Sequence, residues 1–359
     1  MPKFINDTLG MVNPADLLAT GFQVSRPNDP LEGLFDDQQT NNLVATYHTL
    51  ASQYMIPQMA QFHAFDVPAQ KSIPAPITEH NVEKGLIKVK RNTSELLRQL
   101  LGRGVNAEPE LYNYVMDFAG DLSDQVVTRA KVARAELMAT GKVTIKENDI
   151  DLTIDYGVPA ANLALTLDFG AGASADVPTQ IQTIVDNAAD AGVTITGIVT
   201  SRSTLTKLRS NTAIQKAING INMEGVLVSN AALQAWLADE YGITTVVTDD
   251  LSYSLPYTLG NDGRPVVTSK RYFPKNVCTF FGTSNGMKLG SGLWGIPPEV
   301  DIANFYTGGV QGSGNPYVYI SQWAEKDPAV LWTKASALYM PVLYNPNGLY
   351  VAKVIETSA

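Results

Sequence analysis

Apolar residues recur at three- and four-residue steps over residues 108–140, and this pattern predicts one long amphipathic helix. The stripe consists of Leu111, Val115, Phe118, Leu122, Val126, Ala130, Ala133 and Leu137. Pro109 suits the first turn, and Gly141 stands where a left-handed residue would close the last one. At about 1.5 Å per residue the helix would be roughly 50 Å long, which suggests a strut rather than an element of a compact domain.

Beyond Gly141 the apolar residues alternate, and two strands are predicted on either side of a turn at 147–149. Residues 158–310 then mix helices with short strands, which is typical of an independent α/β or α+β domain. The expected helices are 178–191, 201–219 and 229–241, and the expected strands are 194–199, 243–248, 265–268 and 277–281. Residues 317–355 return to strands, interrupted by a turn at 345–348.

The N-terminal part of the chain has less periodic structure. Residues 1–40 carry two cations and six anions, 2 − 6 = −4, and few apolar repeats, so they are expected to be an arm that is ordered only against another surface. Residues 41–60 have apolar residues at helical spacing, and Pro57 is expected to end this short helix.

Residues 61–103 contain a candidate ribbon. Pro68, Pro74 and Pro76 exclude a central strand, whereas residues 85–91 alternate apolar and basic side chains. From 83 to 103 there are six cations and two anions, 6 − 2 = +4. The pattern predicts a long basic hairpin within an acidic protein.

Composition limits the classes of function. The net charge of −9 argues against a general nucleic-acid binder, although it allows nucleic acid to be enclosed without being gripped. Charged residues make up 17% of the chain, below the usual value of about 25%, which suggests that much of the surface is hidden against other chains. Cys278 is the only cysteine and lies in an apolar run, so a buried side chain is expected and an intrachain disulfide is excluded. The N-terminus lacks a signal-peptide pattern and no run is long enough to span a membrane, so a soluble protein made in a reducing cytoplasm is expected.

The search for chemistry identifies one alternative function. Residues 290–295 match the dinucleotide pattern G-x-G-x-x-G, but Pro297 and Pro298 oppose the helix that must follow it. A nucleotide-dependent enzyme using the glycine-rich stretch 282–295 is therefore kept only as an alternative. The acidic run 148–155 lacks the glycine and distal glutamate of a calcium loop, and the three histidines are not at ligand spacing. No catalytic residue, cofactor or metal is expected.

Short motifs in a fixed order resemble those of a known family. They are Glu136-Leu137, Thr140-Gly-Lys142, Ile154-Asp-Tyr-Gly157, Ile198 to Leu205 with Asn211, Phe273-Pro-Lys-Asn276, Trp294-Gly-Ile-Pro297, Met340-Pro-Val-Leu343 and Asn345-Pro-Asn347. Together they resemble the lambda-like major capsid proteins of tailed phages, known as phage major capsid protein E, over roughly residues 60–359.

The resemblance implies an α+β, HK97-like capsid fold. Its parts would be an N-terminal arm with a short helix (1–60), an extended loop (61–103), a peripheral domain and an axial domain (158–316). The peripheral domain would combine residues 104–157, with the 108–140 helix as its spine, and residues 317–359. Gly141 and Gly157 would be structural hinges between the spine helix and the sheets.

The resemblance also implies a function. The chain would be the major head protein of a tailed bacteriophage, and it would assemble as hexamers and pentamers into an icosahedral shell around double-stranded DNA without sequence-specific binding. The extended loop would lie across a neighbouring subunit through Lys84, Ile87, Lys88, Val89, Lys90 and Arg91. A loop lysine, Lys84 or Lys88, could also be crosslinked to Asn345 or Asn347 of a neighbour.

The expected partners are other copies of the chain, a separate scaffolding protein, a portal and a possible decoration protein, with no membrane. The separate scaffold is expected because no long helical N-terminal domain is predicted that could serve as a built-in scaffold, although residues 1–40 could do part of that job. The protein would be located in the virion after assembly in the host cytoplasm. An encapsulin-like compartment for cargo enzymes is a second alternative with the same fold.

Overall fold

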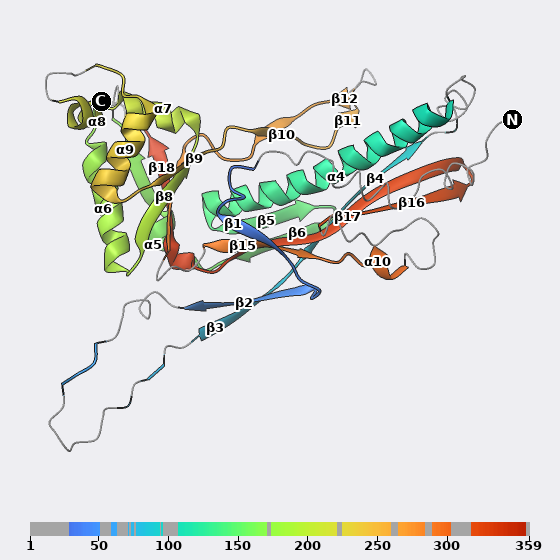
Figure 1. Ribbon diagram of the computed structural model, residues 1–359, viewed down its shortest axis with the longest axis horizontal. Helices are drawn as coiled ribbons and strands as arrows, with labels where there is room; N and C mark the ends of the chain where they lie inside the picture. The colour runs from blue at the N-terminus through green and yellow to red at the C-terminus, as the bar shows by residue number, and fades with distance from the viewer. Residues whose placement is uncertain are drawn as a thin grey trace.

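The computed structural model describes residues 29–50, 59–62, 71, 73–74, 77–93, 95, 107–170, 174–220, 225–259, 265–283, 289–302 and 317–356. Within these ranges the chain forms two five-stranded sheets beside one long helix (Figure 1). The predicted α+β class is confirmed.

The long helix α4, Ala107–Thr140, confirms the helix predicted from the apolar stripe. From Ala119 onward the stripe is buried, including Leu122, Val126 and Leu137. The amide of Gly141 donates to the carbonyl of Leu137 at 2.8 Å, and Gly141 has φ +71°, so it closes the helix as predicted.

The first sheet has strand order β1-β15-β17-β16, with β4 also paired to β17. The strands are β1 Phe35–Gln39, β4 Gly85–Thr93, β15 Gly290–Gly295, β16 Tyr319–Lys326 and β17 Ala329–Leu343. The helix α4 packs on β17 and β4, and apolar residues of the helix and of the sheet share one core. We call this unit the strut unit.

The second sheet has strand order β7-β18-β14-β8-β9 and a core of its own. Its strands are β7 Leu165–Asp168, β8 Thr194–Thr200, β9 Thr245–Thr248, β14 Val277–Thr283 and β18 Leu349–Ile355. The helices beside it are α5 Ala160–Leu163, α6 Val177–Asp190, α7 Arg202–Ser210, α8 Thr212–Asn219 and α9 Asn230–Tyr241. Cys278 is buried in this core as predicted, and burial raises the pKa of its thiol to about 12.

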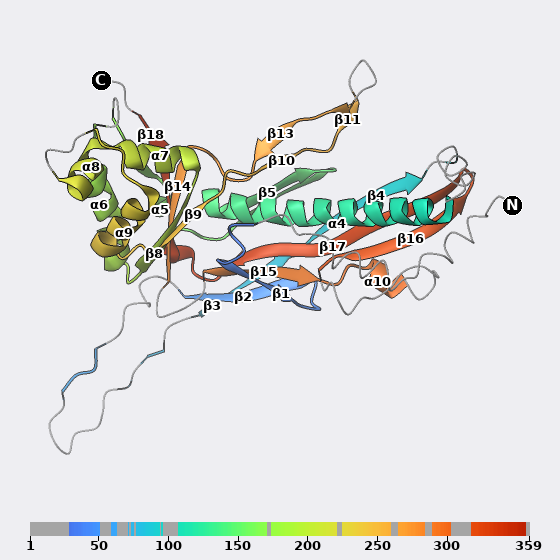
Figure 2. The same cartoon turned by 45° about the horizontal axis from the view of Figure 1, so that its top comes forward.

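Four two-stranded ribbons and two short helical turns complete the described structure (Figure 2). The ribbons are β2 Val44–Leu50 with β3 Ile77–Glu83, β5 Lys142–Glu147 with β6 Ile150–Asp155, β10 Ser252–Ser254 with β13 Ser269–Arg271, and β11 Thr258–Leu259 with β12 Pro265–Val266. The turns are α10 Glu299–Ile302 and the 3-10 helix Pro346–Gly348. The pair β5–β6 confirms the two strands predicted after Gly141.

Three local predictions are wrong. The helix expected over residues 41–60 is strand β2 as far as Leu50, because every residue of β2 pairs with β3 and Tyr47 is buried; residues 51–58 lie outside the described residues. Residues 29–40 are not an arm awaiting a partner, since Phe35 is buried and β1 pairs in parallel with β15. The single helix expected at 201–219 is two helices, because the Asn211 side chain caps α8.

The boundaries of the predicted parts also need correction. Residues 85–93 were assigned to the extended loop, but β4 pairs with β17 inside the strut unit. Residues 290–295 were assigned to the axial domain, but β15 pairs with β17. Residues 349–355 were assigned to the peripheral domain, but β18 pairs with β14 and β7 in the second sheet. The reason is the same in each case: strand partners are far apart in sequence, and the predicted parts were drawn as continuous segments.

Candidate subunit interface

The ribbon β2–β3 is anchored to the strut unit at its base. Ala45 and Tyr47 are buried, and the Tyr47 ring stacks on His80 with centroids 5.2 Å apart. Thr49 and His80 form a side-chain hydrogen bond of 2.7 Å. The ribbon therefore leaves the body from a fixed base.

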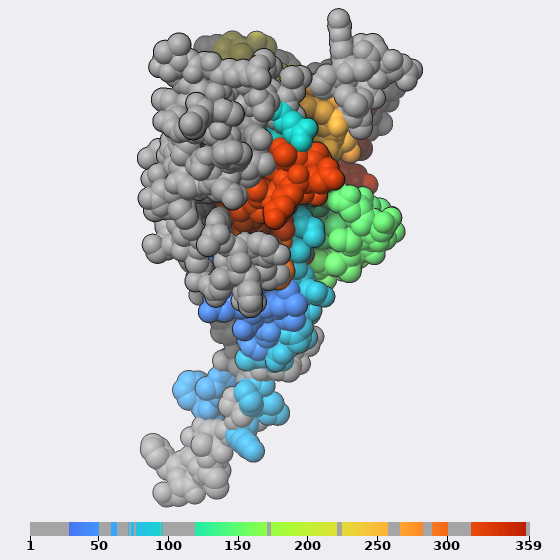
Figure 3. Space-filling model, turned by 90° about the vertical axis from the view of Figure 1, so that its right-hand side faces the viewer, coloured from blue at the N-terminus to red at the C-terminus, as the bar shows by residue number. Residues whose placement is uncertain are grey.

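Beyond this base the described side chains are no longer covered. Met59 is 88% exposed, Phe62 is fully exposed, and Ile73 and Ile77 are exposed as well. Figure 3 shows residues of the ribbon and the segment beyond it standing clear of the body. We call the described residues between 41 and 83 the projecting segment. Because water penalises exposed apolar side chains of this size, their gathering on one segment marks a surface for another chain.

Lys84 is not part of such a surface. The residue is 3% exposed, and its Nζ donates to the carbonyl oxygens of Asn42 at 2.7 Å, Thr40 at 3.2 Å and Trp294 at 3.3 Å. Burial lowers the pKa of its ammonium group. Lys84 therefore links three segments of its own subunit. Both Lys84 and Asn345 are buried, so neither side chain is accessible for the crosslink between subunits that was considered for them.

The other predicted interface residues lie on β4. Ile87 and Val89 pack on the core of their own subunit, so their apolar surface is used within the chain. Lys88 and Lys90 are exposed on the opposite side of the strand, and the Lys90 Nζ lies 4.2 Å from the centroid of the Trp332 ring. Arg91 forms an ion pair of 3.0 Å with Asp121. An interface role for Lys88, Lys90 and Arg91 stays a prediction.

The two proposed hinge glycines have the backbone conformation that glycine favours, with φ +71° at Gly141 and +75° at Gly157. A Cβ at Gly141 would lie 3.0 Å from a methyl carbon of Val158, whereas a Cβ at Gly157 would have open space. The carboxylate of Asp155 accepts from the Gly157 amide at 2.9 Å and from the Lys142 ammonium at 2.7 Å. These bonds lower the pKa of Asp155, the Lys142 bond being the larger cause.

A buried charge cluster on α4 was missed by the sequence analysis. The Arg134 guanidinium donates to Asp29 at 2.9 Å, to Asp37 at 2.5 Å and to the Tyr339 hydroxyl at 3.1 Å. One turn away, the Lys131 ammonium lies 4.4 Å from the centroid of the Tyr272 ring, and burial lowers its pKa. Two cations on the buried side of a predicted helix were the available signal, since buried charges require partners.

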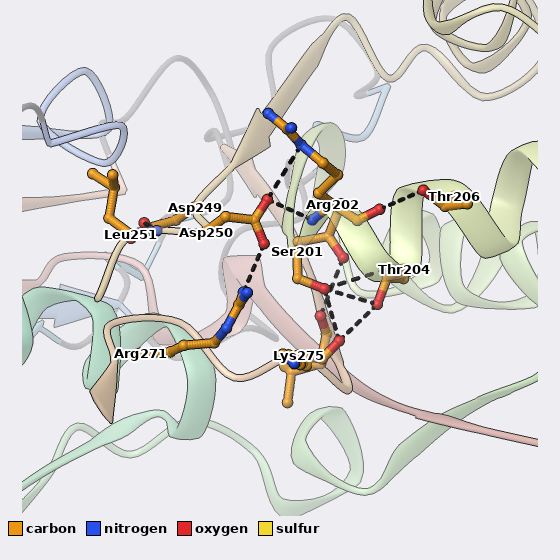
Figure 4. A network of polar contacts seen from close by, with 11 residues as sticks. Ser201, Arg202, Thr204, Thr206, Asp249, Asp250, Leu251, Arg271 and Lys275 are labelled. Carbon is orange, nitrogen blue, oxygen red and sulfur yellow. Dashed lines mark hydrogen bonds and ion pairs between the residues drawn. The ribbon is translucent and has the colours of Figure 1, made fainter. Parts of the chain in front are cut away.

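A second polar network lies beside the second sheet (Figure 4). Ser201 and Thr204 both donate to the carbonyl oxygen of Lys275, at 2.8 and 2.9 Å, and Asp250 binds Arg271 at 2.7 Å. Asp250 also accepts from the amide of Arg202 at 3.0 Å. The Ser201 hydroxyl is engaged with a carbonyl and as the cap of α7, so the arrangement holds α7 and the 249–275 segment in place rather than activating a nucleophile.

The glycine-rich residues 290–295 form the strand β15, which lies between β1 and β17 and is buried throughout. A Cβ at Gly290 would lie 2.3 Å from the Val342 carbonyl oxygen, and one at Gly292 would lie 2.3 Å from the Asp37 carboxylate. Close packing therefore requires these glycines, and residues 290–295 do not form a phosphate-binding loop. Among the described residues no group of three His, Cys, Asp or Glu side chains could hold a metal ion. The helices in the described ranges include none with the length and apolar content to span a membrane.

A strut helix, two sheets and a projecting segment with uncovered apolar residues are features of a structural protein with a surface for another chain. Residues 58–354 match the family described as phage major capsid protein E, so the chain belongs to that family and is a tailed-phage capsid protein, a component of the virion.

Solved structures agree on the fold. A putative capsid protein of an Escherichia coli prophage is 13% identical with a TM-score of 0.57, and the match covers 96% of this chain and 99% of that one. A phage-related protein of Bordetella bronchiseptica is 10% identical with a TM-score of 0.51, covering 95% and 97% of the two chains. No curated protein matches the sequence. The HK97-like fold expected from the sequence is thereby confirmed.

Proposed function

We propose that this chain forms hexamers and pentamers that close into an icosahedral shell around double-stranded DNA, after assembly in the host cytoplasm. The observation that carries the proposal is the projecting segment, whose Met59 and Phe62 side chains find no cover in their own subunit. A contact between two different surfaces of identical subunits closes into rings, which is what capsomers require.

The same proposal includes the DNA inside the shell and the other proteins needed for assembly. The net charge of −9 makes the chain repel DNA rather than bind it, so DNA would be enclosed without sequence-specific contacts. A scaffolding protein, a portal and a possible decoration protein are the further partners that we propose. The protein would have no enzymatic activity.

The two alternatives receive less support. The family match is to phage capsid proteins, which favours a phage head over an encapsulin-like compartment. The alternative of a nucleotide-dependent enzyme required the glycine-rich stretch 282–295 to form a phosphate-binding loop. Residues 290–295 of that stretch form the buried strand β15 instead.

The proposal can be tested by expressing the chain alone and examining it by negative-stain electron microscopy and light scattering. Rings or shells are expected for the unchanged protein, whereas Phe62→Asp should give unassembled subunits with an unchanged circular dichroism spectrum. Phe62→Leu keeps an apolar side chain and serves as the matched control. Shells from Phe62→Asp would contradict self-assembly through the projecting segment. An unchanged chain that stays monomeric at high concentration would mean that the scaffolding protein is missing or that the proposed function is wrong, and the comparison would then be repeated with the scaffolding protein present.

A further inference from the structure

Residues 251–259 and 265–271 form a second extension that the sequence analysis left inside the axial domain. We call it the second ribbon. Its strands pair only with each other, β10 with β13 and β11 with β12, and join neither large sheet. Isolated two-stranded ribbons are marginal in water, and their outer edges have free backbone groups.

The base of the second ribbon is fixed. The rings of Tyr253 and Tyr272 lie 5.0 Å apart, and Arg271 forms its ion pair with Asp250. The amide of Leu255 donates to the carbonyl of Thr268 at 2.9 Å, which continues the pairing outward. This base keeps the extension in one direction relative to α4.

Farther along, apolar side chains of the second ribbon face water. Tyr257 is 67% and Val267 is 62% exposed, and Val266 is exposed too. Besides the β5–β6 ribbon, which exposes Ile150 and Leu152, the described part of the subunit thus contains two extensions with uncovered apolar residues, the projecting segment and the second ribbon. They leave the body on opposite sides, with β2 and β3 below and β10, β11 and β12 above in Figure 1. A subunit with this shape cannot cover one extension with the other.

The charges of the two extensions are complementary. The described residues of 41–83 carry one cation, Lys71, and two anions, Glu79 and Glu83, 1 − 2 = −1. The described residues of 251–271 carry two cations, Lys270 and Arg271, and no anion, 2 − 0 = +2. The basic residues once assigned to the loop belong to β4, so the part that projects is acidic.

We propose that the projecting segment of one subunit lies on the second ribbon of a neighbouring copy of this chain. Apolar residues such as Phe62 would cover apolar residues such as Val267, and the acidic segment would meet the basic ribbon. Charge complementarity selects the partner and the orientation, while burial of the apolar residues holds the contact. The proposal rests on the proposed shell function, because it requires many copies arranged head to tail.

Site-directed crosslinking tests the contact. Cys278 is buried, so the background reaction is low. Phe62→Cys and Val267→Cys subunits would be purified separately, mixed, assembled and treated with a short bis-maleimide, whose two rings each add one thiol. A dimer band is expected on a denaturing gel from the mixture and not from either variant alone. A chain with both substitutions should give a ladder of covalent oligomers.

The controls separate this proposal from the function on which it rests. Leu227→Cys, also exposed, replaces Val267→Cys in a matched mixture with Phe62→Cys and should give no dimer. If a cysteine prevents assembly, Met59→Cys with Val266→Cys provides a second pair. Particles that form normally while both pairs fail to crosslink would overturn the proposed contact and leave the shell function intact. Absence of any particles from the unchanged chain, even with the scaffolding protein present, would count against the shell function itself.

Discussion

The buried Arg134 allows the most quantitative prediction. Its side chain is 4% exposed, and its partners Asp29 and Asp37 are 9% and 11% exposed. The three side chains join α4 to the segment that carries β1. Replacement by methionine keeps an unbranched apolar stem and removes the guanidinium group, so two buried carboxylates lose this cation.

The expected cost follows from the burial. Removing one partner of a buried ion pair destabilises a protein by about 3–5 kcal/mol, because the remaining charge is desolvated without compensation. An unfolding entropy of about 2.1 cal/mol/K per residue gives roughly 0.75 kcal/mol/K for the 359 residues. Arg134→Met should therefore lower the Tm by about 4–7 °C.

The assay is thermal unfolding of unassembled subunits at one protein concentration, since assembly would itself raise the Tm. Lys146→Met serves as the control. It breaks an ion pair whose side chains are 66% and 73% exposed, so the free energy of unfolding should change by less than about 1 kcal/mol. Adding Asp29→Asn and Asp37→Asn to Arg134→Met should restore part of the lost Tm. A Tm within 1 °C of the unchanged protein for Arg134→Met, or no recovery in the triple variant, would refute the reasoning.

Three further predictions concern the helix and the sheet. Gly141→Val should lower the Tm, because a positive φ costs a branched residue about 1–2 kcal/mol and its Cβ would meet Val158; an unchanged Tm would disprove the need for glycine at this helix end. Lys88→Glu with Lys90→Glu should leave the circular dichroism and Tm unchanged but reduce particle yield in electron micrographs, and normal particles would remove this exposed face from the interface. Burial first, and the Asp121 charge second, raise the pKa of Asp124 to about 6 from an ordinary 3.8. The stabilisation from Asp124 should therefore be fully present below about pH 4 and be lost as the pH rises through 6; Asp124→Asn should abolish this loss and raise the Tm at pH 7, and a Tm difference between the variant and the unchanged protein that does not vary with pH would argue against Asp124 as its source.

Elements defined by local periodicity could be predicted from the sequence. The helix 108–140, its end at Gly141 and the ribbon 142–155 depend on residues that are neighbours along the chain. The strand β2 could not be predicted in this way, because Leu43, Tyr47 and Leu50 have helical spacing and only pairing with β3 selects the strand. Tertiary pairing here outweighs local pattern.

The candidate interface was predicted in kind but not in position. The basic run 84–91 looked like a projecting hairpin because alternation shows that a strand has two faces and does not show what pairs with its edges. In the folded chain the edge of β4 pairs with β17, from Gly85↔Tyr339 to Thr93↔Leu331. The exposed apolar residues that mark the projecting segment lie before this run, where Met59 and Phe62 have no periodic context.

The path of the chain between the two sheets also explains why the predicted domain boundaries were wrong. The chain passes from the strut unit to the second sheet between β17 and β18, through the buried turn Asn345–Gly348. A Cβ at Gly348 would lie 2.3 Å from the carbonyl oxygen of Gly282, so this turn packs directly against the second sheet. The second sheet therefore takes β18 from beyond this tight, buried connection, and the strut unit takes β15, β16 and β17 from the chain that follows β14. Because the strands of the two sheets alternate along the chain, neither unit is a continuous segment, so the two units should unfold together, and Tm values measured by probes in each should coincide.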